Sequence, residues 1–565
     1  MMADTFPTAF LFLAAALLVP LLPGGRLRGA LLLAVPAFAL WQIWSLPEGA
    51  LFATRFFGFE LELMRVDSLS RPFAAVFALA ALLGNIYAWH LRDTLQQVAA
   101  LLYAGAAIGA VFAGDLLSLF FYWEGTAVAS VFLIWARRTE GAYHSGMRYL
   151  LVQVGSGVLL LAGIALMWRE TGDIAFGGMR LESPASWLIL LGFGIKAAFP
   201  LLHNWLPDAY PAATVTGTVF LSAFTTKMAI YALARGFAGT ELLLPVGVVM
   251  ALFPIPFALI ENDLRRVLSY SLNSQLGFMV AGIGIGSEMA LNGTVAHALA
   301  SVLYQGLLFM AVGAVLYRTG TVRASELGGL FRTMPATAAL SLVGAASIAA
   351  FPLFSGFVTK AMIVDQAAYA GLPLVWGALV LAGVGTLFHS AIRVPLAAFF
   401  AADSARRPKE APGHMLLAMG GAAALSVAIG VFPGAFYALL PYPVDYAPYT
   451  VGHVVGQMQL ILFGMFAFAL MMRLGALPPA ERAVYLDTDW LWRRLLAGLA
   501  ARVGGGLAAA GVAAGGFGRR QAESLVRRLY RSHGPEGRMA RVWPTGAMVI
   551  WVAVLLAVTL ILDFL

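Results

Sequence analysis

Two lysines lie within sequence that otherwise reads as membrane-spanning. The stretch LGFGIKAAFPLLHNWLPDAYPAATVTGTVFLSAFTTKMAIYALAR, residues 191–235, contains Lys196 and Lys227. An ammonium near the bilayer centre costs about 3 kcal/mol on insertion scales, so an intramembrane lysine indicates a charge or proton pathway. Pro200 follows Lys196 closely and should interrupt its helix. Broken membrane helices are tolerated where the freed backbone faces protein or water, so we expect lysine, break and hydrated cavity at one site.

Lysine is used very selectively along the chain. There are 36 basic residues, but the only lysines are Lys196, Lys227, Lys360 and Lys409. The first three lie in apolar segments, whereas the loops use arginine almost exclusively. Arginine stays charged in proteins, whereas a desolvated lysine can lose its proton near neutral pH. A general coding bias toward arginine explains the loops but does not explain these three lysines, which we therefore interpret as functional.

The composition indicates an all-α polytopic membrane protein. The 565 residues are 61% hydrophobic and 11% charged, whereas a soluble domain carries about 25% charged residues. Apolar runs of spanning length predict about 14–16 transmembrane helices. The absence of cysteine excludes disulfides, thiolate zinc sites and iron–sulfur ligation within this chain. We find no dinucleotide fingerprint and no Walker loop, and we expect no bound cofactor or metal.

The sequence suggests four regions. N-terminal helices (1–94) precede a first repeat (95–238), a second repeat (239–402) and C-terminal helices (403–565). The repeat is indicated by Lys196 with Pro200, matched by Lys360 just beyond FPLFSGF. An odd number of spans between the copies would invert the second one.

The distribution of basic residues predicts the orientation. Connections after odd-numbered spans carry most of the Arg and Lys, which places the N-terminus outside and the final connection (475–543) in the cytoplasm. That connection contains DTDWLWRRLLAGLAARV and RRQAESLVRRLYRS. It is basic and amphipathic, so we expect helices along the membrane face or along a neighbour, or simply a basic surface tail.

Glu124 is the candidate partner of the first lysine. It is an isolated acid in the apolar run LSLFFYWEGTAVASVFLIW. A carboxylate in such a run either is neutral or finds a cation, and we predict that Glu124 pairs with Lys196. Weakening and restoring that pair would unload and load a proton. The alternative is a static ion pair that fastens two helices.

Lys227, His297 and Lys360 form a possible relay. Histidine can accept a proton on one nitrogen and donate from the other, although a buried histidine can also be merely hydrogen-bonded. Gln305, on the same helical face as His297, can order water but cannot titrate. Possible accessory residues are His203, Asp208, His389 and Arg393, with Asp208 a candidate helix cap.

Several dispersed motifs resemble the antiporter-like membrane subunits shared by respiratory NADH–quinone oxidoreductase, membrane-bound hydrogenases and multisubunit Mrp-type sodium/proton antiporters. The similarity covers residues 65–400. Its motifs are VDSLS (66–70), FYWEG (121–125), GIKAAFPLLHNWLPDAYPAAT (194–214), LSAFTTKMAIYALAR (221–235), NDLRRVLSYSLNSQLGF (262–278) and FPLFSGFVTK (351–360). The tail, HVVGQMQL followed by ERAVYLDTDWLWRR, resembles the D subunit of the Mrp antiporters in some bacteria more than a complex I subunit.

The resemblance implies two inverted five-helix repeats with broken helices and a central polar axis. The family's glutamate then falls on Glu124 and its lysines on Lys196, Lys227 and Lys360, with His297 at the histidine position. Gln305 departs from the family pattern, because several relatives have lysine there.

These features together favour a proton-translocating subunit of an Mrp-type cation/proton antiporter, which would be a transport protein and not an enzyme. Its partners would be other subunits of the complex, the lipid bilayer, protons and Na⁺, with no nucleic acid, in the bacterial inner membrane. One alternative is a proton-pumping membrane subunit of an NADH–quinone oxidoreductase or membrane-bound hydrogenase. The other is a structural subunit with a vestigial channel, for which Gln305 is the best support.

Overall fold

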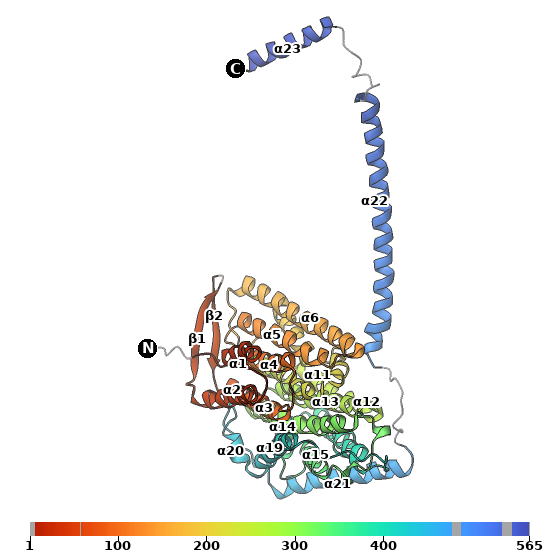
Figure 1. Ribbon diagram of the computed structural model, residues 1–565. Helices are drawn as coiled ribbons and strands as arrows, with labels where there is room; N and C mark the ends of the chain where they lie inside the picture. The colour runs from red at the N-terminus through yellow and green to blue at the C-terminus, as the bar shows by residue number, and fades with distance from the viewer. Residues whose placement is uncertain (1–5, 57, 477–486, 534–544, 564–565) are drawn as a thin grey trace. The chain divides into compact units, whose positions relative to one another are not determined.

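The computed structural model describes residues 6–56, 58–476, 487–533 and 545–563. The chain divides into two units, Met1–Asp487 and Thr488–Leu565. Apart from one hairpin, the regular structure in these residues is helical (Figure 1). The described residues contain twelve helical segments long and apolar enough to cross a membrane and three shorter apolar ones, some of them made of consecutive helices such as Val215–Gly236. The predicted all-α membrane fold is therefore confirmed.

The first unit begins with helices around a β-hairpin. Its elements are α1 (Thr8–Leu18), η1 (Val19–Leu21), α2 (Arg26–Ser45), β1 (Gly49–Phe56), β2 (Phe59–Val66) and α3 (Ser70–Tyr87). The two strands pair antiparallel from Gly49 opposite Val66 to Phe56 opposite Phe59. The hairpin was not predicted. Directly after it, the carboxylate of Asp67 accepts hydrogen bonds from the Ser70 N–H (2.8 Å) and the Arg235 guanidinium (2.6 Å), which fixes the start of α3.

The middle of the chain contains most of the spanning helices. The first set is α4 (Thr94–Phe112), α5 (Leu116–Trp135), α6 (Glu140–Thr171), α7 (Pro184–Lys196), α8 (Trp205–Ala212), α9 (Val215–Ala223) and α10 (Thr225–Gly236). The second set is α11 (Leu243–Leu252), α12 (Pro254–Ile260), α13 (Leu264–Ile285), α14 (Glu288–Thr319), η2 (Ala324–Glu326), η3 (Leu330–Arg332), α15 (Pro335–Ile348), α16 (Ser355–Tyr369), α17 (Pro373–Thr386), η4 (Leu387–Ile392), α18 (Arg393–Pro395) and η5 (Leu396–Phe400). Helices α19 (Gly413–Val431), α20 (Pro433–Tyr437) and α21 (Val451–Arg473) complete this unit.

The two sets share local interactions at corresponding places. Asp115 caps α5 and forms an isolated β-bridge with Ala175, and Asp263 caps α13 and forms one with Arg323. The same five residues, AAFPL, occur at 197–201 and 349–353. These features support the predicted repeat, although its boundaries at 95–238 and 239–402 stay predictions.

Each AAFPL segment interrupts a spanning helix. Ala198 (φ 60°) and Leu201 (φ 69°) separate α7 from α8, and Ala350 (φ 58°) and Leu353 (φ 74°) separate α15 from α16. Residues other than glycine rarely adopt this left-handed backbone conformation, which costs about 1–2 kcal/mol per residue. In both segments the phenylalanine N–H reaches back to a carbonyl five residues earlier, at 2.9 Å. The interruption predicted after Lys196 is confirmed.

Helix α14 lies in the middle of the first unit (Figure 1), and 94% of its most apolar window is buried. Helix α13 packs beside it and carries a fully buried arginine. The Arg265 guanidinium donates to the Ala213 carbonyl (3.0 Å) and the Thr218 hydroxyl (3.0 Å). It thereby satisfies a backbone carbonyl freed where α8 ends and a side-chain hydroxyl in α9.

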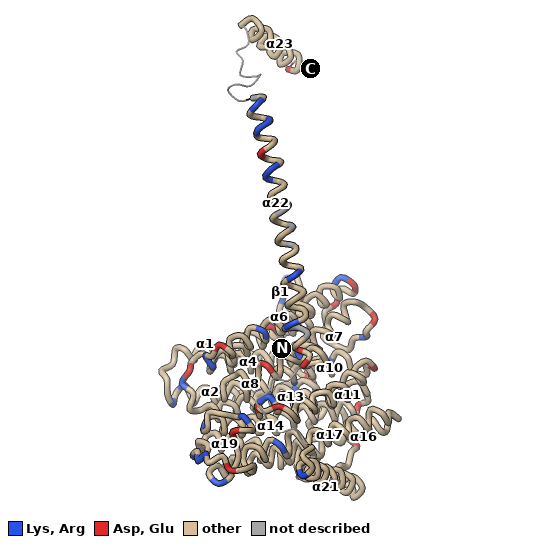
Figure 2. Tube along the Cα trace, turned by 90° about the vertical axis from the view of Figure 1, so that its right-hand side faces the viewer, with Lys and Arg blue, Asp and Glu red and all other residues tan. Residues whose placement is uncertain are grey.

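The second unit contains η6 (Leu491–Leu496), α22 (Ala497–His533) and α23 (Thr545–Asp563). Figure 2 shows Lys and Arg crowded in the C-terminal half of α22, where Glu523 pairs with Arg519 (3.1 Å) and Arg527 (3.5 Å). A basic helix in this region was predicted. Residues 477–486 and 534–544 of the predicted connection lie outside the described residues, and its place on the membrane stays a prediction.

Close contact between α11 and α13 yields a stability prediction. A Cβ at Gly277 would lie 2.2 Å from the Ala251 nitrogen, whereas a Cβ at Gly155 would meet nothing within 4 Å. Gly277→Ala should therefore destabilise the fold by about 1–3 kcal/mol, because the two backbones must separate. Thermal unfolding in detergent would show a lower Tm for Gly277→Ala than for the control Gly155→Ala. Equal melting temperatures would contradict the packing described.

Candidate functional site

Lys196 is buried at the end of α7 and is bound by α5. Its Nζ donates to the backbone carbonyl of Trp123 and to the Thr126 hydroxyl (2.9 Å). The same Nζ lies 4.6 Å from the centre of the Trp123 ring, a cation–π distance. A carbonyl, a hydroxyl and an aromatic face thus replace the hydration of this ammonium.

Glu124 does not form an ion pair with Lys196, so the predicted direct contact is wrong. Its Oε1 is buried without a hydrogen-bond partner in the described residues, and a Cβ placed on Gly157 of α6 would lie 1.6 Å from it. The carboxylate thus packs against α6, while the carbonyl of Trp123 and the hydroxyl of Thr126, two residues after Glu124, satisfy the lysine. The two charged groups are neighbours that do not touch.

Lys227 lies in the first turn of α10, next to the interruption between α9 and α10. Its Nζ donates to the Ser222 carbonyl (2.8 Å) and to the Gln305 side-chain oxygen (3.4 Å). Gln305 projects from α14, and both side chains are buried. The residue that departs from the family pattern is therefore in direct contact with the second lysine.

His297 is the hub of a buried polar cluster. Its Nδ1 lies 3.1 Å from the Thr359 hydroxyl, and its Nε2 lies 3.2 Å from Gln275 Oε1 and 3.3 Å from the Tyr304 hydroxyl. Helices α13, α14 and α16 supply these groups. Because imidazole has two nitrogens, His297 can link the α13 side of the cluster to the α16 side.

Lys360 follows Thr359 directly and lies next to the second broken helix. Its Nζ donates to the carbonyl of Ile348, the last residue of α15, at 3.0 Å. It also lies 4.8 Å from the centre of the Phe278 ring. A helix C-terminus carries partial negative charge and favours a cation there. All three membrane lysines thus have a backbone carbonyl acceptor, and each lies beside a helix interruption.

Some buried polar atoms on the same helices have no hydrogen-bond partner in the described residues. They include both amide atoms of Gln153 and Asn273, the hydroxyls of Thr226 and Ser271, and Gln305 Nε2. Buried polar groups in proteins are generally hydrogen-bonded, and internal water commonly supplies the missing partner. Helices α6, α10, α13 and α14 therefore carry surplus hydrogen-bonding capacity suited to internal water.

The possible accessory residues lie in separate contacts. His203 Nε2 lies 3.3 Å from Asp487 Oδ2, which also accepts from the Tyr270 hydroxyl (2.7 Å). Asp208 was expected to be a cap, but it lies inside α8 and binds the Arg148 guanidinium (2.8 and 3.0 Å). Thr214 caps α9 instead.

The last two accessory residues are also outside the lysine contacts. His389 Nδ1 lies 2.7 Å from the Ser390 hydroxyl, and Arg393 donates to the Ala258 carbonyl (2.7 Å). In the part of the chain that the structure describes, no group of three or more His, Asp or Glu side chains could hold a metal ion.

The sequence reasoning missed four polar residues that complete these contacts: Thr126, Gln275, Tyr304 and Thr359. Each lies in a predicted span, and Gln275 lies within the motif NDLRRVLSYSLNSQLGF. Their only signal was a polar side chain in an apolar helix. This signal is weak for Thr, because its hydroxyl is often satisfied by its own helix, and weak for Tyr, because most of its side chain is an apolar ring.

The chain was compared with known families and proteins. The family model "NADH:quinone oxidoreductase/Mrp antiporter, TM" matches residues 113–386, which contain Glu124, His297 and the three membrane lysines. The A subunit of the Na⁺/H⁺ antiporter of Alkalihalophilus pseudofirmus is 33% identical over 336 residues, 53% of this chain and 42% of that protein. The D subunit from the same organism is 30% identical over 313 residues, 52% of this chain and 63% of that protein.

A further relative is covered over most of its length. The NAD(P)H-quinone oxidoreductase chain 4 of a Synechococcus species is 30% identical over 379 residues, which are 61% of this chain and 72% of that protein. Among solved structures, a chain of the Mrp complex from Dietzia sp. matches with a TM-score of 0.76 at 27% identity, over 88% of this chain and 59% of that one. This chain spans less than half of the matched antiporter A subunit. The chain belongs to the NADH:quinone oxidoreductase/Mrp antiporter family of transmembrane subunits.

Proposed function

We propose that this chain is a proton-translocating subunit of a multisubunit Mrp-type Na⁺/H⁺ antiporter in a bacterial membrane. The observation that carries the proposal is the placement of the three membrane lysines, each of which is buried, lies beside a helix interruption and donates to a backbone carbonyl. Lysine is the basic residue that can release its proton in such a site. The antiporter A and D subunits among its relatives support the same class of function.

Lys196 and Glu124 are the proposed loading site. In the present arrangement the ammonium is held by Trp123 and Thr126, while a carboxylate oxygen of Glu124 lies buried and unpaired nearby. Movement of Nζ toward Glu124 would stabilise the charged amine, and movement back would make release of the proton easier. The lysine therefore has two positions whose affinities for a proton differ.

The onward route is proposed to run through contacts already present. Lys227 is hydrogen-bonded to Gln305, and the next residue on α14, Tyr304, contacts His297. His297 contacts Thr359, which precedes Lys360. Because Gln305 cannot titrate, the step between Lys227 and His297 requires water ordered by the amide and by the unpaired polar atoms around it.

A second candidate function is a proton-pumping membrane subunit of a redox complex. It is favoured by one comparison, since the chain covers 72% of a NAD(P)H-quinone oxidoreductase chain, compared with 63% of the antiporter D subunit and 42% of the antiporter A subunit. The same relay would then be driven by electron transfer in partner subunits. Isolation of the native complex decides between the two, because iron–sulfur or quinone-binding partners would establish the redox assignment.

The first prediction concerns the chemistry of Lys196. Both Lys196→Ala and Lys196→Arg should abolish ion-coupled proton transport in vesicles containing the assembled complex, because arginine keeps the charge but cannot release a proton. Lys409→Arg, at an exposed position, is the matched control and should transport normally. Full transport by Lys196→Arg would show that the lysine is only a fixed charge.

The second prediction concerns the position of Glu124. Gly157→Ala should reduce proton transport at least severalfold while leaving Glu124 and Lys196 intact, since the new methyl occupies the space of the carboxylate. Glu124→Ala should reduce it further by removing the acid. Gly155→Ala, in the same helix with open space around it, is the control. Wild-type rates for both Gly157→Ala and Glu124→Ala would exclude a role for this carboxylate.

The third prediction concerns the link between His297 and Lys360. Thr359→Val keeps the shape of the side chain but removes the hydroxyl 3.1 Å from His297 Nδ1, so the transport rate should fall severalfold with little change in Tm. Thr559→Val serves as control, because that hydroxyl bonds only to carbonyls of its own helix. A lower Tm with an unchanged rate per folded complex would assign Thr359 to packing alone.

A further inference from the structure

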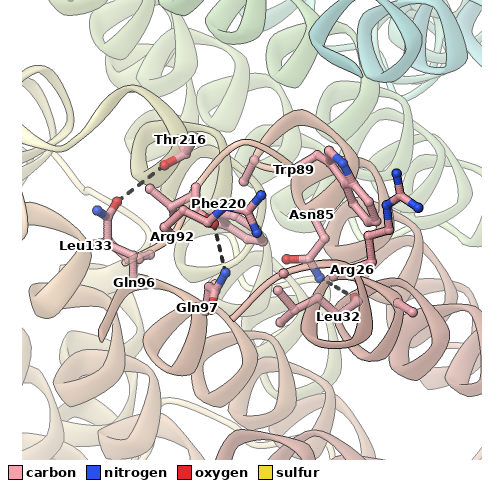
Figure 3. Close-up of a pocket in the computed structure, with 16 residues that line it drawn as sticks. Arg26, Leu32, Asn85, Trp89, Arg92, Gln96, Gln97, Leu133, Thr216 and Phe220 are labelled. Atoms are coloured by element: carbon pink, nitrogen blue, oxygen red, sulfur yellow. Dashed lines mark hydrogen bonds between the residues drawn. The ribbon is translucent and has the colours of Figure 1, made fainter. Parts of the chain in front are cut away.

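A second site lies away from the lysines, where α2 and α4 begin and α3 ends. Its cavity volume is about 430 Å³, within the range of roughly 300–1,000 Å³ typical of small-molecule sites. The lining comes from α2, α3, α4, α5, α9 and the connection between α3 and α4, and it includes no acidic residue (Figure 3).

Two arginines give this pocket its charge. Arg26 is the first residue of α2, and Arg92 lies in the connection between α3 and α4. Both are exposed, and neither forms an ion pair with a carboxylate of the described residues. The carboxylate adjacent in sequence, Asp93, is already bound by Arg138 (3.3 Å) and Gln96 (3.2 Å). Two guanidinium groups are therefore available to an anion.

A third arginine nearby, Arg28, differs from these two because its guanidinium is used in the fold. Arg28 is buried and donates to the Leu22 carbonyl (2.6 Å) and the Thr94 hydroxyl (2.8 Å). Its role is structural, because these bonds tie the start of α2 to α4. Arg26 and Arg92 form no such hydrogen bonds with the described residues, so their guanidinium groups can bind a ligand.

The remainder of the pocket is apolar and aromatic. Leu32, Leu133 and Phe220 line its interior, and Trp89 lies beside Arg26 in the view of Figure 3. Trp89 is 42% exposed and rests on Gly29, where a Cβ would lie 2.8 Å from the indole ring. Tryptophan and arginine at the end of spanning helices are typical of headgroup depth. Only 28% of the apolar window of α2 is buried, so the rest of this helix can face lipid.

We propose that this pocket binds one anionic phospholipid. Its phosphate contacts Arg26 and Arg92, and the first part of an acyl chain lies against Leu32, Leu133 and Phe220. Charge complementarity carries the choice of occupant, because the site offers two cations and no acid. A zwitterionic lipid would bring an ammonium group for which no carboxylate lines the pocket, and inorganic phosphate would leave the apolar lining unused. The proposal does not depend on the proton route.

The test uses the purified full-length chain after delipidation in detergent. Binding is measured by native mass spectrometry and thermal shift with phosphatidylglycerol, phosphatidylcholine and inorganic phosphate as separate probes. Phosphatidylglycerol should bind and raise the Tm most. The double variant Arg26→Gln, Arg92→Gln should bind it at least roughly tenfold more weakly, because each arginine near a lipid surface contributes about 1 kcal/mol.

Two further variants separate binding from folding. Arg55→Gln, Arg180→Gln makes the same change in net charge at exposed positions outside the pocket and should bind phosphatidylglycerol as the wild type does. Gly29→Val keeps both arginines but displaces Trp89, so it should also weaken lipid binding. Equal responses to the two lipids, an equal shift with inorganic phosphate, or wild-type affinity in Arg26→Gln, Arg92→Gln would each overturn the proposal.

Discussion

An ammonium group inside hydrocarbon must be given acceptors, and in this chain backbone carbonyls supply them. The carbonyls of Trp123, Ser222 and Ile348 each accept from one lysine. A continuous helix uses most of its carbonyls internally, so a carbonyl at a helix end is the more available acceptor, as Ser222 at the end of α9 and Ile348 at the end of α15 are. The Trp123 carbonyl lies inside the continuous helix α5, and there the Thr126 hydroxyl adds a second acceptor for Lys196. The interruptions after α9 and α15 therefore supply the acceptors of Lys227 and Lys360, whereas the interruption after α7 ends the helix that carries Lys196 itself.

The interruptions need support of their own, and buried polar contacts provide it. Both AAFPL segments place two non-glycine residues in left-handed backbone and recover one hydrogen bond at the phenylalanine N–H. Arg265 satisfies carbonyl and hydroxyl groups where α8 gives way to α9. Each buried polar group in the interior needs a hydrogen-bond partner, and that partner is itself a buried polar group that needs one. The polar contacts of the interior therefore depend on one another.

Much of this could be predicted from the sequence. Composition gives the membrane class, and proline after Lys196 predicts the break, because the ring removes a donor whatever the surroundings. The scarcity of lysine identified Lys196, Lys227 and Lys360 as the residues around which buried polar contacts gather. The contact of Lys227 with Gln305 was also within reach, since both residues had been assigned to one relay.

The remainder depended on tertiary geometry. Lys196 could bond to Glu124 or to the Trp123 carbonyl, and these acceptors belong to adjacent residues. The residue types alone do not show which acceptor the lysine uses. The cluster around His297 requires α13, α14 and α16 to meet at one level, and Asp487 reaches His203 from a distant part of the chain. The hairpin had a readable signal, the alternation in FELELMRV, but it was overlooked among long apolar runs.

The distribution of lysine has a practical consequence. Lys196, Lys227 and Lys360 are enclosed by the fold, while Lys409 lies exposed in the connection before α19. A water-soluble amine-directed reagent would therefore find a single reactive lysine side chain on the folded molecule. Because the chain contains no cysteine, an introduced thiol would be equally unique. Two fluorophores of different attachment chemistry could then report distances within the folded chain without removal of any native residue.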